Sequence, residues 1–468
     1  MKSPRGTLPA LVLVAGVYGE FQARHRAEKR NDGGFKVPIH NDKQRGGYFL
    51  NVTIGTPGQE FALQLDTGSS DVWVPSSNSQ LCREQKPGFG GCSLGSFNVG
   101  KSDTFNNDTN SVFSISYQDE SSSTGTYFKD QLLIGMASLP QFTMGLGAET
   151  TIPYGLAGVG YASDEAALAT SRTWYPNLPL ALQQGGFIKA AAYSLWLNDL
   201  DASKGNILFG AIDTEEYVGD LKRIPVLPNA KTDKITSFLV SMYSLEACSP
   251  SGSDILTSGE LPLPVILDSG TTFSYLPQGL ADQVWEEVGA RWDSQVGLAL
   301  LPCSYANHPG HFSFRFAGSS GPRVNVSMNE LVVPYTSGEA AKFESGSYRG
   351  QSACAIGILN QTGPPYLLGD TFLRSAYVVY DLSNNEIGIA PTNFNTSKSN
   401  VVAFPSNGAA IPSATAVPND LTRSQPQPDH PNMKAARGFQ ATGSAALKGF
   451  RPIPGSALLL VLVALHWS

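Results

Sequence analysis

The feature that most constrains this fold is a short stretch that occurs twice in the 468 residues. Residues 65–74 read Leu-Asp-Thr-Gly-Ser-Ser-Asp-Val-Trp-Val, and residues 267–276 read Leu-Asp-Ser-Gly-Thr-Thr-Phe-Ser-Tyr-Leu. In each copy an apolar strand delivers an aspartate, Asp66 or Asp268, into a turn, after which apolar residues resume. The glycine in each turn lets the backbone reverse sharply. The repetition therefore predicts two lobes of one design.

A second apolar-apolar-glycine element follows each copy, at residues 156–158 and 367–369. A twofold arrangement of such lobes would bring Asp66 and Asp268 face to face. Two carboxyl groups at hydrogen-bonding distance cannot both ionise easily, so they share a proton and titrate as a pair. One of them can then act as a base and the other as an acid, which suits the activation of a water against a peptide carbonyl.

These residues resemble the pepsin-like aspartic proteases, and the similarity extends to the motifs at residues 48–58, 114–117 and 368–374. The resemblance covers about residues 44–394 and is nearest to the fungal yapsin-like, GPI-anchored secreted branch. It implies an all-β, bilobal fold with a cleft between two similar β lobes. It also implies an aspartic endopeptidase that hydrolyses polypeptide substrates at acid pH, as a monomer, without a cofactor or a metal.

The resemblance assigns roles to individual residues around the two aspartates. Asp66 and Asp268 would hold the water, and the hydroxyls of one pair of neighbours would lock the two loops together. A second pair of hydroxyls would hydrogen-bond the outer carboxylate oxygens and fix their orientation. The expected supporting residues are Thr67, Gly68, Ser69, Ser269, Gly270 and Thr271.

Tyr117 resembles the tyrosine of the hairpin flap that closes over substrate. Trp73 resembles the tryptophan that hydrogen-bonds this tyrosine, although packing in the core would explain Trp73 equally well. The flap tip reads Gln-Asp-Glu-Ser, and Asp119 falls where the family borders the pocket for the residue before the cut bond. A carboxylate there would favour Lys or Arg in the substrate. The alternative is that Asp119 and Glu120 are both solvated.

The body of the chain predicts short strands, because 48 glycines and 31 prolines punctuate it. Helical stretches are expected at residues 178–184 and 280–291. We place the N-terminal lobe at residues 44–223 and the C-terminal lobe at residues 224–394. The net charge of −7 gives no support for a nucleic-acid partner.

The N-terminus predicts entry into the secretory pathway. Residues 1–19 have a basic start, an apolar stretch at residues 8–17 and a small residue, Gly19, at the expected cleavage point. The alternative, a buried N-terminal strand, fits the prolines and glycine of this stretch poorly. Residues 20–43 predict a short basic pro-segment or N-terminal extension that contains a dibasic site, Lys29-Arg30. Such a short segment leaves zymogen control open.

The C-terminus predicts attachment to the cell surface. Residues 395–454 are rich in Ser, Thr, Pro, Ala and Asn and predict a disordered stalk. Residues 455–468 form an apolar tail too short to span a bilayer comfortably, which is typical of a GPI-attachment signal. We expect the GPI lipid anchor at Gly443. The alternative is a loose or buried C-terminus.

Five cysteines in a secreted chain predict disulfides with one thiol left over. The resemblance suggests that Cys82 pairs with Cys92 and Cys303 with Cys354, which leaves Cys248 as a buried, inert thiol. Glycosylation acceptors of the Asn-x-Ser/Thr type occur at Asn51, Asn107, Asn325, Asn360 and Asn395.

The competing interpretation is a catalytically silent binding or cell-wall protein of the same fold. Such proteins usually lose a catalytic aspartate or its glycine, and both are intact in this chain.

Overall fold

The structure is a computed structural model that describes residues 33–84, 91–172, 174–336, 340–418 and 433–440. Several sequence predictions concern residues outside these ranges: the signal peptide at 1–19, the Lys29-Arg30 site, Gly443 and the apolar tail at 455–468. Within the described residues, no helix is both long and apolar enough to cross a membrane.

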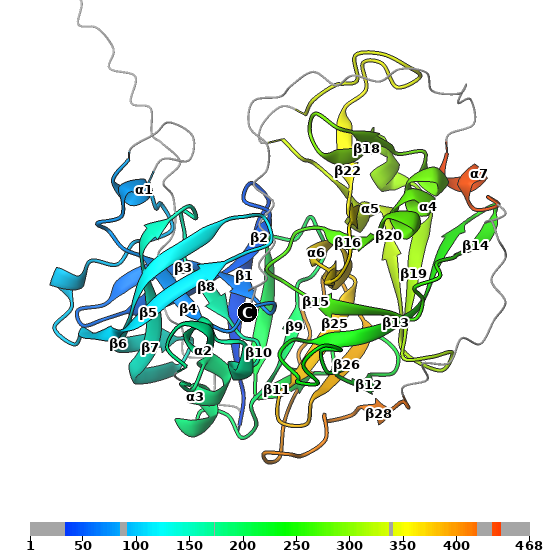
Figure 1. Ribbon diagram of the computed structural model, residues 1–468. Helices are drawn as coiled ribbons and strands as arrows, with labels where there is room; N and C mark the ends of the chain where they lie inside the picture. Colours follow the sequence, from blue (N-terminus) through cyan, green and yellow to red (C-terminus); the bar gives the residue numbers. More distant parts are fainter. Residues whose placement is uncertain (1–32, 85–90, 173, 337–339, 419–432, 441–468) are drawn as a thin grey trace, which may run out of the picture.

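The regular secondary structure of the described residues is mainly β-strand and is arranged in two lobes, as predicted (Figure 1). The largest sheet has 14 strands and runs from the N-terminal lobe into the region between the lobes. In spatial order its strands are β28 (Thr415–Ala416), β12 (Lys222–Pro225), β26 (Glu386–Pro391), β25 (Ala376–Asp381), β9 (Ala192–Trp196), β10 (Lys204–Phe209), β1 (Phe35–Asp42), β2 (Gly47–Ile54), β3 (Gln59–Asp66), β8 (Leu156–Gly158), β4 (Val72–Pro75), β7 (Ala137–Thr150), β6 (Ser122–Ile134) and β5 (Asn106–Ser116).

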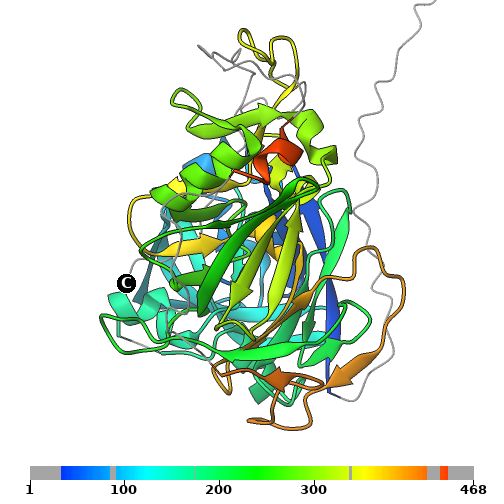
Figure 2. The same cartoon turned by 90° about the vertical axis from the view of Figure 1, so that its right-hand side faces the viewer.

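The C-terminal lobe is built on an eight-stranded sheet, which faces the viewer in Figure 2. Its strands are β20 (Arg323–Ser327), β19 (His311–Phe316), β13 (Leu239–Ser249), β15 (Leu263–Leu267), β24 (Tyr366–Leu368), β16 (Ser274–Pro277) and β23 (Ile358–Gln361), with β14 (Gly252–Leu256) paired to β13. Two smaller sheets join β17 (Arg291–Asp293), β18 (Leu298–Pro302), β22 (Ala353–Ile356) and β21 (Val332–Val333), and β11 (Ala211–Asp213) with β27 (Val401–Ala403).

The helices are short and lie around the sheets. They are α1 (Gln80–Arg83), α2 (Ala166–Thr170), α3 (Leu178–Gln184), α4 (Gln278–Val288), α5 (Met328–Leu331), α6 (Asp370–Leu373) and α7 (Ala436–Phe439). The expected helix at residues 178–184 is present as α3. The helix expected at residues 280–291 ends earlier, because Gly289 takes a left-handed conformation with φ of 71° and Arg291 begins β17.

The two lobes repeat one strand arrangement, as the duplicated sequence predicts. In the N-terminal lobe β3 runs parallel to β8, and β4 runs antiparallel to β8. In the C-terminal lobe β15 runs parallel to β24, and β16 runs antiparallel to β24. Asp66 pairs in register with Gly158 at the end of β3, and Leu267, the residue before Asp268, pairs with Leu368. Each aspartate therefore leaves its strand at the same point of the same unit.

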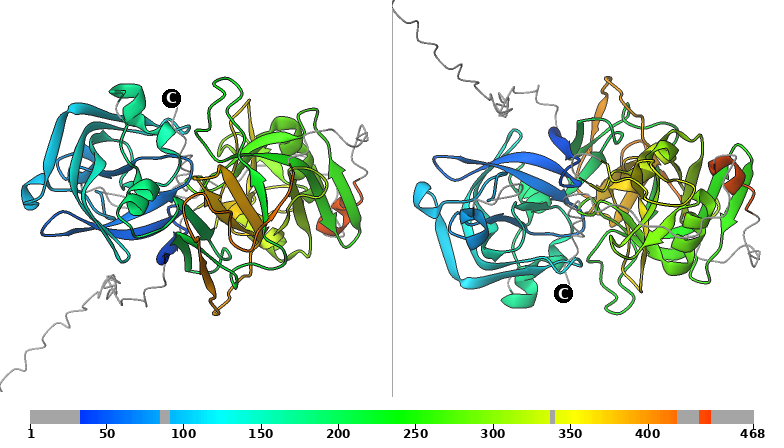
Figure 3. Two further views of the ribbon diagram at one scale, coloured as in Figure 1. Left: turned by 90° about the horizontal axis from the view of Figure 1, so that it is seen from below. Right: turned by 90° about the horizontal axis from the view of Figure 1, so that it is seen from above.

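The strands between the lobes come from both halves of the chain. Strand β25 pairs with β9, and β26 pairs with both β25 and β12. Viewed from below, Figure 3 shows these strands between the two lobes. The predicted boundary near residue 223 therefore divides the chain into two halves, but strands from both halves pair in the same sheet.

The predicted lobes are too short at both ends, because ordered strands lie before residue 44 and after residue 394. Residues 35–42, assigned to the N-terminal extension, form β1, which pairs with β2 and β10. Residues 401–403, assigned to the disordered stalk, form β27 against β11, and β28 pairs with β12. The side chains of Phe404 and Ile411 are buried. The first part of the predicted stalk is therefore packed on the protein, because a few apolar side chains and strand pairing hold it there.

Candidate active site

Asp66 and Asp268 lie at the ends of β3 and β15, and both are 0% exposed. The backbone N–H of Gly68 donates to Oδ1 of Asp66 at 2.8 Å, and the Ser69 hydroxyl donates to Oδ2. The second lobe repeats this pattern.

Around Asp268, the N–H of Gly270 donates to Oδ1 at 2.8 Å, and the Thr271 hydroxyl donates to Oδ2 at 2.5 Å. The two carboxyl groups lie close enough for each to affect the pKa of the other. Each carboxylate is thus held in a fixed orientation by one amide and one hydroxyl from its own loop.

Thr67 and Ser269 join the two loops across the molecule. The Thr67 hydroxyl accepts from the Ser269 N–H and donates to the carbonyl of Leu267, both at 2.9 Å. The Ser269 hydroxyl accepts from the Thr67 N–H at 3.2 Å and donates to the carbonyl of Leu65 at 3.0 Å. These four reciprocal bonds fix the distance between the loops, and hence between the two aspartates.

The glycines downstream of each motif are required by close backbone contact. A Cβ at Gly158 would lie 2.7 Å from the backbone of Asp71, and a Cβ at Gly369 would lie 2.3 Å from the carbonyl oxygens of Thr271 and Phe273. Any side chain there would push away the loops that carry Asp66 and Asp268. This explains why the apolar-apolar-glycine elements accompany the aspartates in the sequence.

Burial shapes the acidity of the pair. Burial and then the charge of Asp268 hold the pKa of Asp66 well above its usual value. Burial raises the pKa of Asp268 to about 6, against the opposing effect of the hydrogen bonds from Thr271 and Gly270. Because the second negative charge is disfavoured beside the first, the pair retains one proton in mildly acidic solution.

The predicted flap is the hairpin of β5 and β6, and Tyr117 is the first residue of the turn that joins the two strands. The Trp73 indole N–H donates to the Tyr117 hydroxyl at 2.8 Å, and both side chains are buried. Trp73 also packs beside Phe113, with ring centroids 5.9 Å apart. Trp73 therefore packs in the core and also hydrogen-bonds the tyrosine of the predicted flap. The two roles that the sequence suggested for Trp73 are compatible.

The flap tip reaches the opposite lobe. The Gln361 amide of β23 donates to the Gln118 side chain at 3.4 Å. Asp119 is half-buried and accepts from the Ser121 N–H at 3.0 Å, whereas Glu120 is exposed. Burial raises the pKa values of Tyr117 and of Tyr275 in the C-terminal lobe, and the charge of Asp119 adds a smaller raising effect at both, so Asp119 lies near both lobes.

A model of the eukaryotic aspartyl protease family matches residues 47–392. The chain belongs to the eukaryotic aspartyl protease family. It is 41% identical over 388 residues to the probable aspartic-type endopeptidase OPSB of Arthroderma benhamiae, covering 82% of this chain and 76% of that protein. It is 32% identical over 403 residues to aspartic proteinase yapsin-3 of Saccharomyces cerevisiae, covering 84% of this chain and 74% of that protein.

Among solved structures, the aspartic proteinase from Irpex lacteus aligns with a TM-score of 0.59 at 22% identity. The alignment covers 78% of this chain and all of that one, and at this identity it supports the fold alone. The predicted pepsin-like family, its yapsin-like branch and the all-β bilobal fold are confirmed. The protein is a hydrolase of the aspartic-type endopeptidase class.

This aspartyl protease also contains a buried polar cluster that the sequence did not reveal. Asp71 accepts from the hydroxyls of Tyr127 and Tyr175, each at 2.6 Å, and from the N–H of Ala166 at 2.8 Å. Both carboxylate oxygens of Asp71 therefore have hydrogen-bond partners, just after the loop that carries Asp66. Asp71 stands within the first motif, but no regular spacing connects it to the two tyrosines, so only the fold brings them together.

A second missed feature is a direct link between the lobes at the protease cleft. The Gln64 side chain, buried in β3, donates to the carbonyl of Gly270 at 3.1 Å. The Thr272 hydroxyl donates to the carbonyl of Gly46. A glutamine in a strand carries no sequence signal for such a contact.

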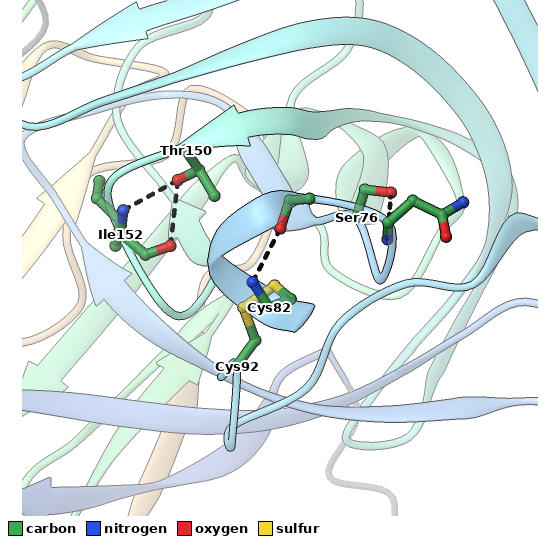
Figure 4. The surroundings of a disulfide bond; sticks show 7 residues. Ser76, Cys82, Cys92, Thr150 and Ile152 are labelled. Atoms are coloured by element: carbon green, nitrogen blue, oxygen red, sulfur yellow. Dashed lines mark hydrogen bonds between the residues drawn. A yellow bond between two sulfur atoms is a disulfide. The ribbon is translucent and has the colours of Figure 1, made fainter. Parts of the chain in front are cut away.

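The cysteines of the protease pair as the resemblance suggests, Cys82 with Cys92 and Cys303 with Cys354. Figure 4 shows the first disulfide at α1, where the Cys82 N–H donates to the Ser79 hydroxyl at 3.2 Å. Cys248 is free and half-buried, and burial raises the pKa of its thiol. A thiol with a raised pKa is a poor nucleophile at acid pH, in keeping with the expected inert role.

The predicted glycosylation acceptors differ in exposure. Asn107, Asn325 and Asn395 are exposed, whereas Asn51 in β2 and Asn360 in β23 are partly buried. In the part of the chain that the structure describes, no group of three or more His, Cys, Asp or Glu side chains could hold a metal ion.

Proposed function

We propose that this protease cleaves peptide bonds with a water held between Asp66 and Asp268. The observation that carries the proposal is the matched pair of buried carboxyls, each fixed by one amide and one hydroxyl and both with raised pKa values. The ionised carboxylate takes a proton from water, whose oxygen bonds to the peptide carbon. The protonated carboxyl donates its proton to the carbonyl oxygen, which gives a diol.

The diol then collapses to products. The C–N bond breaks, the amide nitrogen takes a proton and leaves as an amine, and the carbonyl reforms as a carboxylic acid. Water and the two carboxyls supply every proton in this sequence. The flap, with Tyr117 held by Trp73, would close over the peptide and exclude bulk water.

Binding of a statine-type inhibitor, whose hydroxyl stands where the attacking water would be, tests this proposal. We expect the wild-type protease to bind it in calorimetry at acid pH. The Asp66→Asn variant should bind at least about 100-fold more weakly, because it loses a charge-assisted hydrogen bond worth about 3 kcal/mol. Equal affinities in the two proteins would contradict the shared-proton pair.

We infer a preference for Lys or Arg before the cut bond. The support is the position of Asp119, half-buried at the flap tip and close to Tyr275 across the cleft. A charge-assisted hydrogen bond contributes on the order of 1.5–3 kcal/mol, or roughly ten- to a hundredfold in selectivity.

The neighbouring acid Glu120 provides a matched control for this test. Peptides with Lys, Arg, Leu or Phe before the scissile bond are compared in wild type, Asp119→Ser and Glu120→Ser. We expect the kcat/KM ratio of Lys to Leu to fall in Asp119→Ser alone. An unchanged ratio in Asp119→Ser would remove this side chain from the pocket.

We also propose that the protease is secreted, glycosylated and held at the cell surface by a GPI anchor at Gly443. The support is the sequence of the two ends. Phosphatidylinositol-specific phospholipase C should release the full-length protein from membranes, and deletion of residues 444–468 should send it into the medium. A mature protein that retains Trp467 would contradict the anchor.

We infer that any removable pro-segment ends near Arg30 and does not extend to residue 43. The support is β1, which begins at Phe35 and pairs with two strands of the mature fold. N-terminal sequencing of the mature protease should therefore begin at or near Asn31. A mature terminus at or beyond residue 44 would contradict this boundary.

A further inference from the structure

A piece of the C-terminal tail lies against the C-terminal lobe, beyond the part that matches the protease family. Residues 433–440, here called the tail strap, include α7, the red helix that contacts the lobe beside α4 and β14 in Figures 1 and 2. Phe439 is 0% exposed and stacks on Phe312 of β19, with ring centroids 5.4 Å apart and planes at 9°. Ala435 is equally buried.

Two glycines allow the tail strap to lie close against the C-terminal lobe. A Cβ at Gly310 would lie 2.0 Å from the ring of Phe439, so only glycine leaves room for this ring. A Cβ at Gly438 would lie 2.3 Å from the Ser249 hydroxyl oxygen, so only glycine lets the strap approach β13 this closely. One of the two glycines is in the lobe and the other in the strap.

Polar groups of the lobe also satisfy the strap backbone. The buried carboxylate of Asp254 accepts from the Ala435 N–H at 2.7 Å, and the Ser249 hydroxyl donates to the Ala435 carbonyl at 2.7 Å. The Ser251 hydroxyl donates to the carbonyl of Lys434, and the Gln440 amide donates to the carbonyl of Glu286 at 3.1 Å. The contacts therefore combine an apolar anchor with specific hydrogen bonds at both ends of the strap.

We propose that the C-terminal lobe carries a docking groove whose occupant is the tail strap, and that docking fixes where the tail leaves the enzyme. The groove is formed by β13, β14, β19 and α4. The tail then leaves the lobe at Gln440 instead of at Val417, the last residue with a backbone hydrogen bond to β12 within the described range 340–418.

This exit point determines how far the catalytic body can stand from a membrane, a consequence that rests on the proposed anchor at Gly443. From Gln440, the extended chain reaches Gly443 in about 10 Å. From Val417 it could span up to about 90 Å. A docked strap thus holds the C-terminal lobe next to the lipid surface, and a released strap frees the enzyme to move away from it.

Hydrogen exchange of the full-length protein tests the strap directly. The amides of Ala435, Gly438, Phe439 and Gln440 all donate hydrogen bonds in the docked state. A peptide covering residues 433–440 should therefore exchange slowly in wild type. Phe439→Ser removes the buried ring and should accelerate this exchange on the order of 100-fold. Phe439→Leu should restore part of the protection.

Arg437→Ala is the matched control, because the Arg437 side chain is exposed within the same strap. Its exchange should equal that of wild type. Exchange in wild type at the rate of an unstructured peptide would overturn the proposal, as would protection that Phe439→Ser leaves unchanged. The wild-type measurement decides even if Phe439→Ser fails to fold. Resistance to phospholipase C would contradict the anchor alone, since protection of the strap does not depend on lipid.

Discussion

A single buried acid, Glu165, predicts that this protease loses stability as the pH rises. Glu165 precedes α2 and is 2% exposed. The Tyr175 N–H donates to Oε2 at 3.2 Å, and Oε1 has no hydrogen-bond partner among the described residues. The pKa of Glu165 is raised to about 9, chiefly by burial, against the lowering effect of the Tyr175 bond and with a smaller raising effect of the nearby charge of Asp71.

The direction of the effect follows from the proton balance. Unfolded Glu165 loses its proton near its ordinary pKa of 4.5, whereas the folded protein keeps that proton until about pH 9. Between these values the folded state binds more protons, so the free energy of unfolding falls with rising pH. The stability is fully present below about pH 4.5 and declines by up to about 1.4 kcal/mol per pH unit. From pH 4.5 to 7 the loss reaches about 3 kcal/mol.

Glu165→Gln removes this titration, and urea unfolding at pH 4, 5, 6 and 7 measures the result. The slope of the unfolding free energy against pH should become shallower than in wild type by up to about 1.4 kcal/mol per unit. The slope is the readout, because an amide in this site changes absolute stability as well. Glu149→Gln, at an exposed acid of the same lobe, should leave the slope unchanged. Parallel curves for wild type and Glu165→Gln would refute the reasoning.

Two further predictions concern the active-site supports. Trp73→Phe removes the donor to the Tyr117 hydroxyl, so KM should rise more than kcat falls. The free energy of unfolding should also drop by about 1 kcal/mol in thermal unfolding. An unchanged KM would show that this bond does not position the flap. Thr67→Val leaves the Ser269 N–H and the Leu267 carbonyl unpaired in a buried site, so the unfolding free energy should fall by roughly 2–4 kcal/mol in urea titrations. A loss below 0.5 kcal/mol would contradict this role of Thr67.

The fold could be predicted from the sequence where both lobes carry the same motif, because both aspartates have the same steric requirement. Each aspartate needs a glycine turn beside it and a second glycine beneath it, and the contacts at Gly158 and Gly369 show why no other residue fits. The cluster around Asp71 could not be predicted, because Tyr127 and Tyr175 come from distant segments with no shared spacing. Its geometry exists only after the lobe has folded.

The tail shows where composition misleads. Its Ser, Pro and Asn content is typical of a disordered segment, yet Phe404, Ile411 and Phe439 are buried against the protein. These side chains are too widely spaced to give a periodic pattern, so the sequence carries no strand or helix signal for them. The strands and the docking groove of the folded lobes hold the tail in place, so the tail needs only a few separate apolar side chains that pack against them.

The central claim is that Asp66 and Asp268 activate one water with one shared proton. The turnover number of Asp268→Asn on a denatured protein substrate at acid pH tests it most directly, with thermal unfolding to show that the variant is folded. We expect kcat to fall at least about 1,000-fold, because the amide can neither ionise nor exchange a proton with Asp66. Folded Asp268→Asn with undiminished turnover would contradict the claim.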